Sequence, residues 1–110
     1  MSARKGEYVA TIGVMGPFHK SVALEPGQSS WVDFGESDGF GDCALSVTAT
    51  AHQGNKGTTH VLRVDNVNVT SEDVGKGDIP MKAYNAGCNV TNNGETTITE
   101  WSVLVGVIVP

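Results

Sequence analysis

The chain has 110 residues, with 7 Lys and Arg against 12 Asp and Glu, which gives a net charge of −5 at pH 7. This length is that of one ordinary domain, so we predict a single domain over residues 1–110. The negative charge and the scattered basic residues argue against a nucleic-acid partner, which needs clustered Lys and Arg. The longest apolar run, residues 103–109, is far shorter than the roughly 20 residues of a spanning helix, so no membrane insertion is expected.

The composition indicates an all-β protein. Glycine supplies 14 positions, and threonine and valine are abundant among the rest. Branched side chains suit a pleated strand, and glycine accepts the positive φ angles of tight turns. Long segments rich in Ala, Leu, Glu and Lys, which would favour helices, are missing from the sequence.

Alternation of apolar and polar residues recurs between segments rich in Gly, Pro, Asn and Asp. It predicts seven strands, at residues 7–15, 19–25, 29–35, 43–52, 60–70, 81–91 and 96–109. Gly16 and Pro17 should end the first strand, and a change of parity near Asp65 predicts a bulge. The sequence NNGE at residues 92–95 predicts a hairpin turn between the last two strands. Together these signals favour an antiparallel β-sandwich of about seven strands, Ig-like or jelly-roll-like.

The two cysteines, Cys43 and Cys88, share the parity of the apolar residues in their strands, so both should face the core. We predict a disulfide between them, which would indicate an oxidising compartment. Two buried free thiols are the alternative. A metal site is disfavoured, because neither a CxxC spacing nor a nearby histidine pair accompanies them.

A cysteine pair that joins an early and a late strand resembles the bridge of immunoglobulin-like sandwiches. The run from Cys88 to Ile108 is similar to the closing strands of Ig-like modules in bacterial surface and adhesion proteins. The chain departs from the Ig pattern in having no tryptophan between the cysteines and Ala86 where the corner tyrosine would lie. The resemblance implies a sandwich fold and secretion, and it names no functional residue.

No catalytic motif is visible. His19, His52 and His60 lie beside predicted strand ends or loops without an HxH or HExxH partner, and they are interpreted as solvated imidazoles. A GxSxG elbow and a phosphate-binding P-loop are both missing. We therefore expect that the protein is not an enzyme.

The acidic stretch from Ser29 to Cys43 is the best candidate for a site. Its hard oxygen donors could bind calcium, and no other cofactor is expected; the candidate ligands are Asp33, Glu36, Asp38 and Asp42. Aromatic rings beside carboxylates also suit glycan binding, and the candidate residues are Trp31, Asp33 and Phe40. The favoured interpretation of this stretch is nevertheless a hydrated connection, in which the glycines make turns and Trp31 or Phe34 enters the core.

The last strand is apolar on both faces, which indicates either a covered central strand or an interface with another subunit. The candidate interface residues are Trp101, Val103, Leu104, Val105, Val107 and Ile108. A homo-oligomer or a larger assembly is therefore an expected partner state.

These observations lead to one expected function and one alternative. We expect a non-enzymatic binding module, extracellular or on a virion surface, that recognises a glycan or a protein. The alternative is a structural protein that assembles, or coats a particle, through its apolar C-terminal strand.

Overall fold

The computed structural model describes residues 11–53 and 57–110, and it confirms the all-β class. The described part of the chain contains a 3-10 helix, η1 (Asp38–Asp42), and six strands: β1 (Thr11–Lys20), β2 (Ser29–Glu36), β3 (Ala44–Ala51), β4 (Leu62–Asp73), β5 (Lys82–Asn92) and β6 (Trp101–Val109). Within these residues, no helix has the length and apolar character needed to cross a membrane.

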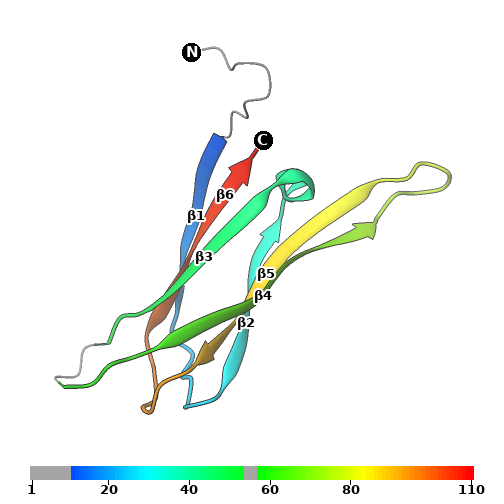
Figure 1. The fold of residues 1–110 in the computed structure, drawn as a ribbon. Coiled ribbons are helices and arrows are strands. Elements are labelled where there is room, and N and C mark those ends of the chain that lie inside the picture. The colour runs from blue at the N-terminus through cyan, green and yellow to red at the C-terminus, as the bar shows by residue number, and fades with distance from the viewer. Residues whose placement is uncertain (1–10, 54–56) are drawn as a thin grey trace, which may run out of the picture.

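The strands form two antiparallel three-stranded sheets that pack as a β-sandwich (Figure 1). Sheet 1 has the order β1-β6-β3, and sheet 2 has the order β2-β5-β4. The pairing is nested, because the first strand pairs with the last and the second with the fifth. Among the six strands of the described residues, only β4 and β5 are neighbours both in sequence and in a sheet.

The N-terminal part differs from the prediction. Gly16 and Pro17 do not end a strand; the register of β1 against β6 shifts between Met15 and Phe18, and the strand continues to Lys20. Gly16 makes this possible with a φ of 94°, where a side chain would collide with the backbone of Phe18 and Val103. The predicted strand at residues 19–25 is not a separate strand, and residues 7–10 of the predicted first strand lie outside the described residues.

The predicted bulge in the fourth strand is confirmed. The pairing of β4 with β5 shifts register between Asp65 and Asn68, and Asn66 has a φ of 50°. One extra residue in β4 reverses which side chains face the other sheet. Val64 therefore faces inward before the bulge, and Val69 does so after it.

The predicted hairpin at residues 92–95 is wrong, because β5 and β6 lie in opposite sheets. The buried side chain of Asn92 shapes the connection instead. Its Nδ2 donates to the carbonyls of Leu24 at 2.8 Å and Thr96 at 2.7 Å, and its Oδ1 accepts the N–H of Gly94 at 3.0 Å. Asn92 thus fixes the crossing between the two sheets and binds the segment before β2 to it.

The core lies between the sheets, where Phe18 and Phe34 stack across the layers with ring centroids 5.7 Å apart. The indole Nε1 of Trp101 donates to the carbonyl of Val22 at 2.9 Å, so the largest buried side chain has its polar atom paired. The buried cluster contains Leu24, Val32, Phe34, Phe40, Ala86, Cys88, Val90, Ile98, Trp101, Val103 and Val105.

A pair of isoleucines tests this assignment of the core. Ile98 is 1% exposed, so Ile98→Ala should lower the free energy of unfolding by about 2–5 kcal/mol in urea titrations. Ile12 is 72% exposed, so Ile12→Ala should change it by less than about 0.5 kcal/mol. Equal losses for the two variants would contradict the packing described.

A pair of asparagines tests the crossing between the sheets. Asn92→Ala removes three hydrogen bonds, leaves the carbonyl of Thr96 and the N–H of Gly94 without this partner, and should cost at least about 2 kcal/mol of unfolding free energy. The neighbouring Asn93 is exposed, so Asn93→Ala should leave the free energy of unfolding almost unchanged. Both variants are measured by urea titration and thermal unfolding. A neutral Asn92→Ala variant would show that the crossing does not depend on this side chain.

Candidate functional site

The predicted ligand-binding residues do not form one surface. Trp31 is 49% exposed on the outer face of sheet 2, where its indole lies over Gly87. Asp33 is exposed, and its Oδ1 accepts the N–H of Gly35 at 2.8 Å. Phe40, in contrast, is only 3% exposed and belongs to the core. The ring that sequence reasoning assigned to a ligand therefore anchors η1 against the sandwich.

The four candidate calcium ligands are also spread out. Asp38 and Asp42 lie at the two ends of η1, which begins with the Oγ of Ser37 accepting the N–H of Gly39 at 3.3 Å. Within residues 11–53 and 57–110, no group of three or more His, Cys, Asp or Glu side chains could hold a metal ion. The arrangement of Asp33, Glu36, Asp38 and Asp42 gives the calcium prediction no support.

The predicted disulfide is wrong, since Cys43 and Cys88 are both free thiols. Cys88 lies in the middle of β5, opposite Val32. Cys43 directly precedes β3 near the end of sheet 1, and its Sγ lies 3.7 Å from the carbonyl oxygen of Phe40. Parity identified the face of each strand correctly, but it carries no information on how far along the sandwich each thiol lies.

The two thiols differ in environment. Cys88 is fully buried, and this burial, with the negative charge of Asp65, raises the pKa of its thiol to about 11. Cys43 is half-buried and lines a surface cavity of about 250 Å³ together with Leu45, Val67, Asn68 and Val69. We call this hollow between β3 and β4 the base cavity.

The C-terminal strand is the centre of sheet 1, so its two apolar faces have different surroundings. Of the six predicted interface residues, Trp101, Val103 and Val105 are buried in the core, and Val107 is half-buried. The other two, Leu104 and Ile108, face outward. Together with Ile12 and Val14 of the neighbouring β1 they form what we call the apolar outer patch.

A serine and a histidine meet on the outer face of sheet 1. The Nε2 of His52 lies 2.5 Å from the Oγ of Ser102, and the ring of His19 lies 6.0 Å from that of His52. A nucleophilic serine needs its histidine oriented by a third group. Among the described residues, no carboxylate is hydrogen-bonded to the other nitrogen of His52, so the pair carries no catalytic assignment.

The hairpin of β4 and β5 projects beyond the two layers (Figure 1). β2 pairs with β5 only as far as Asn85, whereas β4 pairs with β5 to Lys82. Every residue from 66 to 82 is exposed. We call residues 66–82 the arm; they leave both faces of a two-stranded ribbon open to solvent near its tip.

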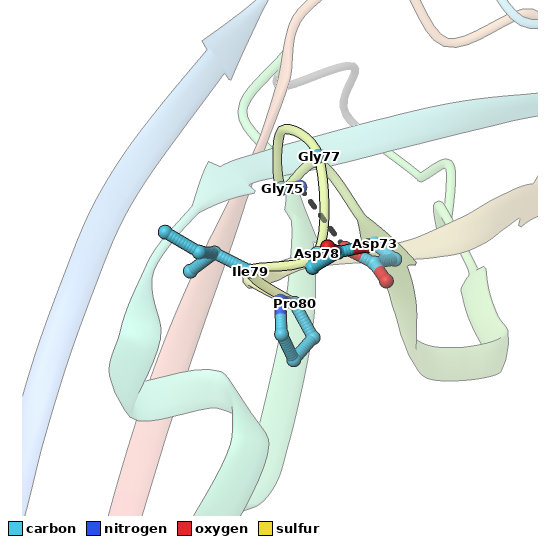
Figure 2. A pocket seen from close by; sticks show the side chains of 6 residues that line it. All are labelled: Asp73, Gly75, Gly77, Asp78, Ile79 and Pro80. Atoms are coloured by element: carbon cyan, nitrogen blue, oxygen red, sulfur yellow. Dashed lines mark hydrogen bonds between the residues drawn. The ribbon is translucent and has the colours of Figure 1, made fainter.

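The tip of the arm is an ordered loop (Figure 2). The Oδ1 of Asp73 accepts the N–H groups of Gly75 at 2.9 Å and Met81 at 3.2 Å, and these bonds lower the pKa of the carboxyl group. Val74 donates its N–H to the carbonyl of Met81 at 2.8 Å. A side chain at Gly75 would collide with the backbone of Ile79 and Met81, so the loop requires glycine there.

This loop presents apolar side chains to solvent. A hollow of about 360 Å³ on one side of it is lined by Val74, Gly75, Lys76, Ile79, Pro80 and Met81. Ile79 is 74% exposed and Met81 is 63% exposed. Large apolar side chains on a projecting loop are typical of a contact surface for another protein.

Sequence reasoning did not find the arm. The sequence analysis leaves residues 71–80 as the connection between the strands predicted at residues 60–70 and 81–91, and nothing in it indicates that this hairpin projects. One signal was available. The strands predicted at residues 60–70 and 81–91 are each longer than the strand predicted at residues 29–35.

Comparison with protein-family models, with curated proteins and with solved structures finds no match for this chain. The function must therefore be argued from the geometry of these surfaces.

The difference between the two thiols can be measured directly. In dilute native protein at pH 8, Ellman's reagent should label Cys43, while Cys88 should react only after denaturation, because the thiolate is the reactive form. A Cys43→Ser variant should lose the native-state labelling. Equal rates for both thiols in the native protein would contradict the burial of Cys88.

Proposed function

We propose that the protein is a non-enzymatic structural protein that assembles with further copies of itself through its arm. The observation that carries this proposal is the unbroken exposure of residues 66–82, which become a two-stranded ribbon beyond the pairing of Thr70 with Asn85. An isolated two-stranded hairpin is marginally stable in water and gains stability by packing against another surface. The arm carries five large exposed apolar side chains to make such a contact: Val67, Val69, Val74, Ile79 and Met81.

A second exposed surface supports assembly. The apolar outer patch lies on sheet 1, with Ile12 72%, Val14 68% and Leu104 44% exposed. The arm belongs to sheet 2, so each copy offers two separate apolar surfaces. Contacts through both would allow growth beyond a dimer.

A recognition module is the second candidate, and Trp31 favours it. On the outer face of sheet 2, Trp31 lies opposite Asn89, which in turn lies opposite Asp65. A half-exposed indole beside an amide and a carboxylate has the chemistry of a glycan-binding surface. This candidate uses the face of the sheet and not the segment at residues 33–42.

The finer fold relationship is also a proposal. In Ig-type sandwiches several consecutive strands are sheet neighbours, whereas here only β4 and β5 are. The nested order favours a jelly-roll-like relationship over an Ig-like one. Jelly rolls occur in viral capsid and lectin domains, so the fold alone does not choose between assembly and glycan binding.

Localisation outside the cell or on a virion surface remains part of the proposal. Because Cys43 and Cys88 are free thiols, there is no disulfide to indicate an oxidising compartment. What supports this location is the assembly proposal: a chain that assembles with copies of itself through an exposed arm could be a component of a particle.

Disruption of the arm tip tests the proposed function. The double variant Ile79→Asp, Met81→Asp should weaken self-association at least about tenfold, because charges replace exposed apolar contacts. The measurement is molar mass by light scattering across a dilution series. Val22→Asp is the matched control, since Val22 is 56% exposed and lies outside the arm. Wild-type protein that stays monomeric throughout the series would overturn the proposal.

A further inference from the structure

We infer that two copies of the chain pair through the free edges of their β3 strands, antiparallel about a twofold axis at Thr48. Sheet 1 then continues from one copy into the other as one sheet with the order β1-β6-β3-β3-β6-β1. This contact does not involve the arm. It adds a second interface to the proposed assembly and is tested separately from the first.

Among the strands of the described residues, β3 is the one regular sheet edge. The other three edge strands, β1, β2 and β4, each have a register shift against their neighbour and at least one charged residue. Bulges and charges on an edge strand hinder its pairing with another chain. β3 pairs with β6 without a shift from Ala44 to Ala51, and it contains no charged residue and no proline. Its free edge can therefore accept another strand along its whole length.

The backbone along this edge has hydrogen-bonding groups to offer. Each residue of an antiparallel strand directs its N–H and C=O groups toward one side, and successive residues alternate between the two sides. β6 pairs with one side of β3. In the described part of the chain, no loop or side chain is hydrogen-bonded to the backbone of Ala44–Ala51. A strand from another chain would satisfy the groups on the open side.

The inner apolar side chains of β3 are only partly covered. Leu45, Val47, Ala49 and Ala51 are half-buried against the core, whereas Val103 of the neighbouring β6 is 0% exposed. Leu45 also lines the base cavity. A strand added beside β3 would remove more of this apolar row from water, which favours association.

The sequence of β3 selects a second copy as the partner, because it is complementary to its own reverse about Thr48. On the inner face, Leu45 of one copy meets Ala51 of the other. Val47 likewise meets Ala49. Each inner pair thus combines a large side chain with a small one, and both copies keep their apolar residues on the inner face.

The outer face of the same register is equally well matched. Ser46 of one copy meets Thr50 of the other, and Thr48 meets Thr48, so every outer pair joins two hydroxyl groups. Such pairs are favourable across strands, and no like charges meet. A strand of another sequence would need this same order of large, small and hydroxyl side chains, which a second copy has by identity. The two equal contacts close a twofold dimer.

The charged groups beside β3 favour the antiparallel direction. Asp38 and Asp42 belong to η1, which leads into β3. Antiparallel pairing places the two η1 segments at opposite ends of the contact, whereas parallel pairing would bring their carboxylates together. In β4, which packs against β3 from sheet 2, Arg63 and Asp65 are ion-paired at 3.3 Å, so this pair adds no net charge.

A cysteine at position 48 tests the twofold axis. Thr48 is exposed, so Thr48→Cys leaves the core intact; it is made in a Cys43→Ser background, where the remaining Cys88 is buried. Copper–phenanthroline should give a disulfide dimer on a non-reducing gel, with peptide mapping that joins residue 48 to residue 48. Opposite residues of an antiparallel pair have Cα atoms about 4.5–5.5 Å apart, which a disulfide can span.

Ser46→Cys in the same background is the matched control. Ser46 is exposed on the same face, but the proposed register places it four residues from its own counterpart, about 13 Å. It should give no dimer alone, whereas Ser46→Cys combined with Thr50→Cys should give one. The cross-link at position 48 should also persist when Ile79→Asp and Met81→Asp are added, because the arm is not part of this contact.

Each further result has its own meaning. Equal cross-linking of Ser46→Cys and Thr48→Cys would indicate a parallel or random contact and overturn the inference. Absence of the Thr48→Cys dimer while light scattering shows association would overturn it and leave the arm contact standing. A Thr48→Cys dimer together with association that the arm substitutions do not weaken would support it and overturn the arm contact. Wild-type protein that is monomeric by light scattering would overturn both.

Discussion

Burial of the two central strands, β5 and β6, is the constraint on which the rest of the structure depends. Cys88 and Val90 from β5 and Val103 and Val105 from β6 are 0% exposed, and the remaining core packs around them. Two sheets of three strands can bury only their inner faces. Four strands are consequently sheet edges, and both outer faces remain available for contacts.

The arm follows from unequal strand lengths within this frame. β4 and β5 have 12 and 11 residues, whereas β2 has 8, so the hairpin continues past the end of its neighbour. The bulge at Asn66 lies within the three-stranded part of sheet 2, because β2 pairs with β5 as far as Asn85, and bulges increase local twist. The exposure of Val67 and Val69 is a tertiary effect, because the end of sheet 1 near Cys43 and Leu45 covers them only in part.

Local pattern predicted what depends on local chemistry. Alternation identified the inward side chains of β5 and β6, and the change of parity near Asp65 identified the bulge. Local pattern gave wrong predictions where contacts between residues distant in sequence determine the strand ends and connections. Gly16 and Pro17 are a usual strand end, but pairing with β6 carries the strand through them. Asn93 and Gly94 are a usual hairpin signal, but Asn92 binds Leu24 across the fold and directs the chain to the other sheet.

The arm also combines a feature set by local sequence with one set by distant contacts. Under the proposed function, this combination couples assembly to folding. The arm tip has a loop ordered by Asp73, yet its ribbon has little apolar burial to resist opening. A partner that covers the arm binds only the closed ribbon, so association and hairpin stability are linked by mass action. The sandwich body, held by its own core, does not depend on this contact. Under the proposed function, the chain is a two-layer scaffold that presents a conditionally stable arm, and self-assembly would supply the burial that the arm lacks.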